Sequence, residues 1–336
     1  MLLLAALLAA GCAPKSDSTP ASKPAGRATA PLKVGLVFDV GGRGDKSFND
    51  AAYNGLERAK QELGVDYSFV ETAEGSDREA GIRQLAAGDA ALVFGVGFLF
   101  SDDILKLAEE FPGKKFTCVD YTVSAGHELP ANLTALKFKE EEGSFLVGAL
   151  AALTSKTGKV GFVGGMQIPL IKKFEAGYVA GVHAVRPGTE VLIKYAGSTG
   201  EAFKDPAKGT ELALAEYNAG ADVIFHASGA TGRGVFQAAE KTNKLAIGVD
   251  SDQYEESPGH VLTSMVKRVD VAVFDTIRDL KDGRWNGGVQ TFGLAEDGVG
   301  WVYDQHNQAL IPAPVKATVD SLKAEIIASH IMVPSE

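Results

Sequence analysis

A regular alternation of short apolar runs and amphipathic segments is the feature that most restricts how this chain can fold. The runs Val34–Phe38, Tyr67–Val70 and Ala91–Val96 have the length and composition of buried strands. Between them, the segment from Phe48 to Leu63 repeats apolar residues at helical spacing, and Gly64 follows as a stop signal. Because strands and helices alternate, the pattern predicts an α/β fold with parallel sheets covered by helices on both faces.

The same order begins again near the middle of the chain. Leu133–Phe138 is predicted to be extended, and Glu140–Leu153 and Ile171–Val185 are predicted to be helical. Further strands are predicted at Val160–Val163 and Val191–Tyr195. A chain of 336 residues is long enough for two domains, so we expect two doubly wound lobes. The halves show no close sequence repeat, so the expected duplication is one of architecture.

Polar residues stand directly after several predicted strands. Asp39, Asp120 and Asp250 each follow an apolar run, and Gly97-Phe98 and Ser228-Gly229 occupy similar places. A single aspartate at such a position is often only a helix cap. Ligands of open α/β sheets, however, bind outside the carboxyl ends of the strands. Three aspartates in equivalent places therefore predict a polar cleft between two facing lobes.

The N-terminus has the pattern of an export signal. Leu2–Ala10 is an apolar run too short to span a bilayer, and it ends in Ala9-Ala10-Gly11-Cys12, which resembles a lipobox. We expect a signal peptide at residues 1–11, a lipid on Cys12 and a disordered tether at 12–31 that spans about 25 Å. The alternative is an ordinary secretory peptide cut near Cys12. The expected location is the extracytoplasmic face of the cell membrane.

Charge and missing motifs exclude several function classes. The formal net charge is -10, which argues against nucleic-acid binding, since that requires a basic face. The Gly-rich loop Gly41–Ser47 has neither the P-loop nor the dinucleotide-binding spacing. The six histidines are scattered, and zinc, EF-hand and nucleophile-elbow motifs are missing. We therefore expect binding without catalysis, and neither a cofactor nor a metal.

The segment Asp39–Asp50, which reads DVGGRGDKSFND, resembles the opening of the basic membrane protein family of ABC-transporter lipoproteins. Purine nucleoside receptors belong to that family. The resemblance extends over residues 33–305, nearly the whole body. Weaker matches follow in order: Phe116–Asp120, Glu141–Leu146, Phe162–Gly165, Phe174–Tyr178, Gly248–Asp252 and Thr263–Lys267.

The resemblance implies a type I periplasmic-binding-protein fold, with two α/β lobes, three hinge crossings and a ligand between them. The N-terminal lobe would contain residues 32–136 and about 268–300, and the C-terminal lobe 137–267 and about 301–336. In the first loop, Asp45 is an alternative to Asp39. The ligand contacts that the resemblance implies are Asp39, Phe48, Asn49, Asp120, Phe203, Gly229, Asp250 and Lys267.

These residue types suit a purine nucleoside such as guanosine, adenosine or inosine. Phe48 and Phe203 could sandwich the base, while Asp120 or Asn49 reads its polar edge. Asp250 would accept hydrogen bonds from the two ribose hydroxyls, and Lys267 would donate to another ribose oxygen. Gly229 would allow a close approach of the backbone. Core packing is the alternative interpretation for both phenylalanines.

The resemblance further implies capture by lobe closure, followed by docking on the membrane permease of an ABC importer. We expect a monomer that is not an enzyme. Three alternatives remain open: the same fold binding a sugar or autoinducer, a gene regulator, and a nucleoside-processing enzyme such as a hydrolase. The regulator is disfavoured because the first 31 residues cannot supply a helix-turn-helix.

Overall fold

The computed structural model of the chain describes residues 31–72, 77–122 and 128–336. The predicted signal peptide, the lipidation of Cys12 and the tether up to Ala30 lie outside the described residues. Residues 31–336, here called the body, form one compact unit. None of the helices described in the body has the length and apolar character needed to cross a membrane.

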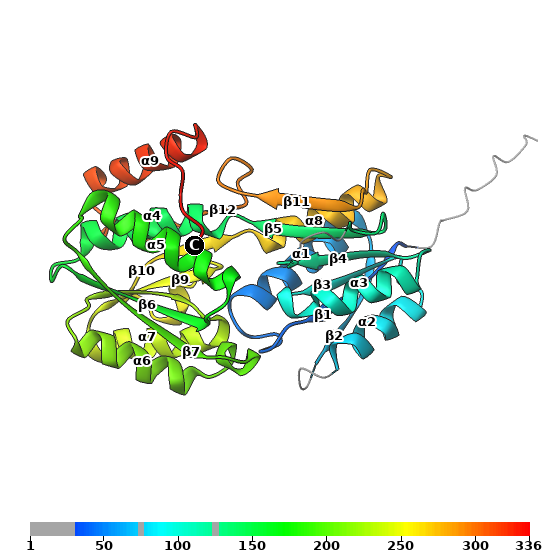
Figure 1. Cartoon of the computed structure of the whole chain (residues 1–336), viewed down its shortest axis with the longest axis horizontal. Helices are drawn as coiled ribbons and strands as arrows, with labels where there is room; N and C mark the ends of the chain where they lie inside the picture. Colours follow the sequence, from blue (N-terminus) through cyan, green and yellow to red (C-terminus); the bar gives the residue numbers. More distant parts are fainter. Residues whose placement is uncertain (1–30, 73–76, 123–127) are drawn as a thin grey trace, which may run out of the picture. The chain divides into compact units, whose positions relative to one another are not determined.

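The first sheet of the body has six parallel strands in the order β11-β5-β4-β3-β1-β2 (Figure 1). Its strands are β1 (Lys33–Phe38), β2 (Asp66–Glu71), β3 (Leu92–Val96), β4 (Lys115–Val119), β5 (Leu133–Phe138) and β11 (Gly288–Phe292). Its helices are α1 (Phe48–Leu63), α2 (Arg78–Ala87), α3 (Ser101–Glu110) and α8 (Val269–Lys281). We call this part of the body the first lobe.

The second sheet repeats the plan in the order β12-β10-β9-β8-β6-β7. Only its edge strand β12 is antiparallel, through pairing with β10. The strands are β6 (Lys159–Met166), β7 (Glu190–Gly197), β8 (Val223–Ala227), β9 (Leu245–Asp250), β10 (Val261–Lys267) and β12 (Val299–Trp301). The helices of this second lobe are α4 (Glu140–Thr154), α5 (Pro169–Val185), α6 (Pro206–Asn218), α7 (Gly232–Thr242) and α9 (Ala313–Ile327).

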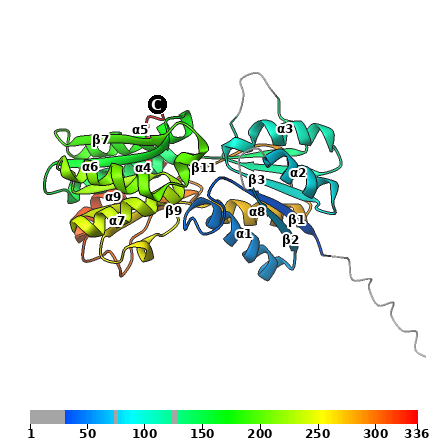
Figure 2. The ribbon, with the colours of Figure 1, turned by 90° about the horizontal axis from the view of Figure 1, so that it is seen from below.

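The two sheets therefore share one topology. If β6–β10 are counted as one to five, both sheets have the order 2-1-3-4-5, and one late strand is added at the edge next to the fifth. The order reverses between the first and third strands, and this is the point at which such sheets bind ligands. Both lobes carry helices on either side of the sheet, as the alternating pattern predicted (Figures 1 and 2).

The chain passes between the sheets three times. It leaves the first sheet after Phe138, returns after Lys267 and leaves again between Phe292 and Val299. Strand β5 thus runs two residues beyond the boundary expected at 136. The third crossing lies earlier than the boundary expected near 301, because β12 already pairs with β10 in the second sheet.

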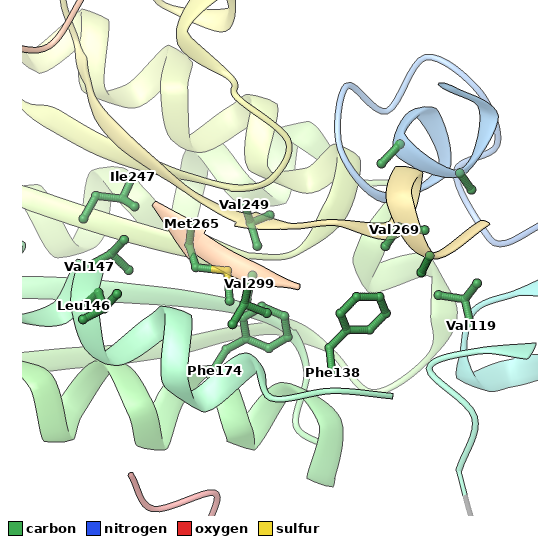
Figure 3. Packing of buried hydrophobic residues seen from close by; sticks show 14 of the residues in the cluster. Val119, Phe138, Leu146, Val147, Phe174, Ile247, Val249, Met265, Val269 and Val299 are labelled. Carbon is green, nitrogen blue, oxygen red and sulfur yellow. The ribbon is translucent and has the colours of Figure 1, made fainter. Parts of the chain in front are cut away.

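One apolar core continues through both lobes at the level of the crossings. Phe138 and Phe174 lie near each other there, with Met265 and Val299 beside them (Figure 3). Next to this region, α4 and α5 approach closely because α5 carries glycine at the contact. A Cβ atom on Gly181 would lie 1.9 Å from the carbonyl oxygen of Phe145, so even alanine would force the helices apart.

A buried acid in the second lobe has a measurable consequence for stability. Glu216 of α6 is fully buried, and its two carboxyl oxygens find no hydrogen-bond partner among the described residues. Burial raises its pKa to about 9, with a small opposing effect from Lys194. The acid is therefore protonated in the folded protein at neutral pH, whereas the unfolded chain ionises it near its ordinary value of 4.5.

Replacing Glu216 by Gln should therefore stabilise the protein increasingly as the pH rises. The stability that the protonated acid contributes is fully present below about pH 4.5 and is lost as the pH approaches 9. We expect Glu216→Gln to raise the thermal midpoint by about 2 °C or more at pH 8 relative to its effect at pH 5, measured by calorimetry. The exposed Glu211→Gln on the same helix is the control. Equal shifts at both pH values would contradict the assignment.

Candidate functional site

A cavity opens between the carboxyl ends of the two sheets, where small-molecule sites of such folds form. Residues of both lobes form its walls. All eight residues that the sequence placed at a ligand site are among them. The lining residues are Asp39, Val40, Asp45, Phe48, Asn49, Gly97, Phe98, Asp120, Leu170, Ile171, Phe174, Phe203, Ala227, Ser228, Gly229, Val249, Asp250 and Lys267.

The strand order explains why these residues meet. In the first lobe, Asp39 follows β1 and Phe98 follows β3, so both lie at the point where the strand order reverses. In the second lobe, Gly229 lies just beyond β8, while Asp250 and Lys267 are the last residues of β9 and β10. Parallel strands bring their carboxyl ends to one edge, and the two edges face the same cavity.

The loop after β1 is held by its own hydrogen bonds. The Oδ1 of Asn49 accepts from the backbone N–H of Asp39 at 3.0 Å, and its Nδ2 donates to Asp45 at 3.1 Å. The carboxylate of Asp45 also accepts from the backbone N–H groups of Ser47, Asn49 and Asp50 at 2.8–3.1 Å. Asp45 thus caps α1, while Asp39 remains available to a ligand.

Asp39 and Asp250 are the two acids with spare acceptor capacity. Asp39 accepts from the backbone N–H of Val40 through Oδ1, and Asp250 accepts from the Ser47 hydroxyl at 2.5 Å through Oδ2. Burial raises the pKa of each to about 7. A ligand that donates hydrogen bonds to these carboxylates would favour their ionised form.

Two of the acids sit in backbone conformations that most residues avoid. Asp120 has φ +60° and Asp250 has φ +65°, both in the left-handed region. Such residues cluster at functional sites, because the surrounding structure must hold them there. Gly229 has φ +56°, and a Cβ atom at this position would lie 3.1 Å from the carbonyl oxygen of Phe203. The glycine therefore permits both the turn and the close approach.

Lys267 is the only cationic side chain among the described residues that line the cavity, and it is already paired. Its Nζ lies 2.7 Å from Asp120 and 2.9 Å from Glu140. Burial opposes its charge, but the two carboxylates hold its pKa well above the usual range. Burial raises the pKa of Asp120 despite the lysine. The ammonium therefore stays protonated and keeps at most one N–H for a ligand.

Phenylalanines supply much of the apolar wall. Phe203 ends a short 3-10 turn, Gly200–Phe203, and meets Phe98 edge to face with ring centroids 6.4 Å apart. Gly165 makes room for this ring, since a Cβ atom there would lie 2.2 Å from Cε1 of Phe203. On another part of the wall, the Nζ of Lys267 lies 5.2 Å from the ring centroid of Phe48.

Two of the expected ligand contacts already have partners within the protein. Asn49 was a candidate for reading the polar edge of a base, but its amide is used within the loop after β1. Asp120 was the other candidate, and Lys267 occupies its carboxylate. Asp39 and Asp250 are therefore the better acceptors for a ligand.

Further residues lie at or behind the site. Sequence reasoning placed Phe98 and Ser228 at strand ends beside the expected cleft but did not count them as ligand contacts, and both line the cavity. Phe174 also lines the cavity, and Glu140 pairs with Lys267 from behind it. Their local sequence gives no sign of this, because the contacts depend on how α4 and α5 pack.

The arrangement suits binding of a small polar molecule with flat or apolar faces. The described residues contain no group of three or more His, Cys, Asp or Glu side chains able to hold a metal ion. His226 is buried in β8, where its Nε2 lies 3.0 Å from Gln253, and burial lowers its pKa to about 4. Ser228 lies 3.5 Å from His226 Nδ1, beyond the usual range for a general base and its nucleophile.

Comparisons with known proteins agree with this geometry. A family model described as "ABC transporter substrate-binding protein PnrA-like" matches residues 32–336. The ABC transporter nucleoside-binding protein BmpA of Lactococcus lactis is 34% identical, over 97% of this chain and 95% of its own length. A lipoprotein of Pyrococcus abyssi is 37% identical over 80% of this chain and 69% of its own.

Solved structures show the same architecture. An ABC transporter solute-binding protein from Aeropyrum pernix superimposes with a TM-score of 0.82 at 30% identity, covering 91% of this chain and 94% of its own. The body has the periplasmic-binding-protein fold, as the sequence predicted.

Proposed function

Since this chain belongs to the PnrA-like family of ABC-transporter substrate-binding proteins, we propose that it captures a purine nucleoside between its two lobes. A membrane permease then receives the nucleoside. The residue combination that carries the proposal is a cavity with aromatic walls and two carboxylates, Asp39 and Asp250, that retain acceptor capacity. Each feature matches one part of a nucleoside.

The flat base fits between aromatic side chains. Phe48 of the first lobe and Phe203 of the second both line the cavity, so closure of the lobes would bring a ring to the ligand from either side. Stacking of a base on one aromatic ring contributes roughly 1–3 kcal/mol in single-strand binding proteins. A monosaccharide could also stack, but it has no second flat face as extended as that of a purine.

The ribose fits the acidic side of the cavity. Vicinal hydroxyls donate two hydrogen bonds, and a carboxylate accepts both. We assign this contact to Asp250, because Ser47 donates to its Oδ2 and leaves Oδ1 without a hydrogen bond from any described residue. The relative named as a nucleoside-binding protein supports the ligand class, since it is 34% identical over 97% of this chain.

The cellular setting follows the same pattern. We propose that Cys12 carries a lipid and holds a monomeric body at the extracytoplasmic face of the membrane. The apolar run before Cys12 and the lipoprotein relative support this placement. The protein would act by binding alone and would need neither a cofactor nor a metal.

Titration calorimetry of the purified body, refolded to remove any carried ligand, tests the proposal. Guanosine, adenosine, inosine, cytidine, ribose and galactose are injected in turn. We expect tight binding of purine nucleosides and none of the free sugars. Binding of a sugar without any response to a nucleoside would retain the fold and reject the ligand. Release of free base from the injected nucleoside would instead indicate an enzyme.

A further inference from the structure

A network of buried charged side chains extends from the cavity into the second lobe. Lys267 bridges Asp120, which lines the cavity, and Glu140, the first residue of α4. The other carboxylate oxygen of Glu140 binds Lys173 of α5, and Lys173 also pairs with Glu141 at 3.1 Å. Negative and positive side chains therefore alternate along this network from Asp120 to Glu141.

Because these side chains are buried, each charge in the network depends on its neighbour for compensation. Glu140 is fully buried and Lys267 is 2% exposed, so neither can turn to water if its partner is removed. Burial opposes the charge of Glu140, but Lys267 and Lys173 together lower its pKa below the ordinary value. Removal of one partner from such a group leaves an uncompensated buried charge.

The same residues lie where the chain crosses between lobes. Glu140 follows the first crossing by one residue, and Lys267 is the last residue before the second. Lys173 also donates a hydrogen bond to the carbonyl oxygen of Phe138, at the end of β5. Neither Glu140 nor Lys173 lines the cavity, and Lys267 is the lining side chain that Glu140 contacts.

We propose that Lys173 and Glu140 are positioning residues that hold the ammonium of Lys267 against Asp120 in the ligand cavity. The inference rests on the proposed function only in its affinity test, in which guanosine is the ligand. It also gives a role to the Glu141–Leu146 segment, because Glu141 pairs with the same lysine, Lys173, as Glu140 does. Loss of Lys173 would let Glu140 and Glu141 draw Lys267 away from Asp120.

The first test is the affinity for guanosine of Lys173→Met, measured by titration calorimetry. We expect affinity at least ~10-fold weaker than that of the unaltered protein. Lys172→Met is the matched control, since Lys172 is the preceding residue and pairs with Glu175 instead. Lys173→Arg keeps the charge in a side chain of different shape, so we expect it to bind guanosine more tightly than Lys173→Met but more weakly than the unaltered protein. Wild-type affinity in a folded Lys173→Met would overturn the proposal.

A double-mutant cycle separates positioning from general stability. In a Lys267→Met background, Lys173→Met should weaken guanosine binding less than ~3-fold further, because the residue through which it acts is gone. Full additivity would overturn the proposal. If Lys173→Met fails to fold, Lys173→Gln takes its place in both tests.

A structural readout distinguishes failure of this proposal from failure of the proposed function. Crystal structures of ligand-free Lys173→Met and Lys172→Met are compared. We expect Lys267 Nζ to leave its position 2.7 Å from Asp120 only in Lys173→Met. If that contact is unchanged, the positioning role is rejected whether or not guanosine binds. If the contact is lost in Lys173→Met but the unaltered protein does not bind nucleosides, only the ligand assignment fails.

Discussion

Asp250→Ala is expected to bind guanosine at least ~100-fold more weakly than the unaltered protein. Hydrogen bonds to a charged group contribute roughly 1.5–3 kcal/mol each, and the proposed contact includes two. Asp250 is 8% exposed, so water cannot easily replace the lost acceptor. Titration calorimetry near pH 8 measures the loss, because there the acid, whose pKa is about 7, is largely ionised.

The control for this variant must account for the bond that Asp250 makes across the lobes. Its carboxylate accepts from the hydroxyl of Ser47, so alanine also removes that contact. Ser47→Ala removes the same contact and leaves the carboxylate in place. We expect a loss of less than ~10-fold for Ser47→Ala. Equal losses in the two variants would show that Asp250 joins the lobes and does not touch the ribose.

Guanosine 5′-monophosphate is expected to bind at least ~100-fold more weakly than guanosine. The phosphate would bring about two negative charges into a cavity that four aspartates line. Lys267, the one cationic lining side chain in the described chain, is already shared between Asp120 and Glu140. Unpaired like charges at an interface cost several kcal/mol.

A neutral analogue separates charge from size in this comparison. 5′-O-methylguanosine adds bulk at the same position without charge, and we expect it to bind more tightly than the monophosphate. Calorimetry at low and high salt then shows whether screening of the charges reduces the difference in affinity between guanosine and its monophosphate. A monophosphate that binds as tightly as guanosine would contradict the acidic cavity as the source of selectivity.

Local sequence patterns predicted most of the elements of this fold. The helix at Phe48–Leu63 and the strand at Leu133–Phe138 were predicted with the bounds that the structure shows. Strand β10, helix α8 and the late strands β11 and β12 were not predicted. Of these, β11 and β12 are edge strands with a weak apolar pattern, and each pairs with a distant partner. Pairing of that kind depends on tertiary context.

The candidate site was predictable where residues stand at strand ends. Asp39, Asp120 and Asp250 could be placed together because parallel strands share one edge. Their division of roles could not be predicted. It depends on Ser47 reaching Asp250 and on Lys267 being held by Glu140, which are contacts between segments more than a hundred residues apart.

The late return of the chain to the first lobe bears on how the protein folds during synthesis. Helix α8 packs closely on α1, since a Cβ atom on Gly55 would lie 2.6 Å from the carbonyl oxygen of Asp270. The edge strand β11 follows α8. A nascent chain ending near residue 138 would hold five of the six strands but would leave that face of α1 and one edge of the sheet uncovered. The lobe made first by the ribosome is therefore completed only after most of the other lobe has been translated.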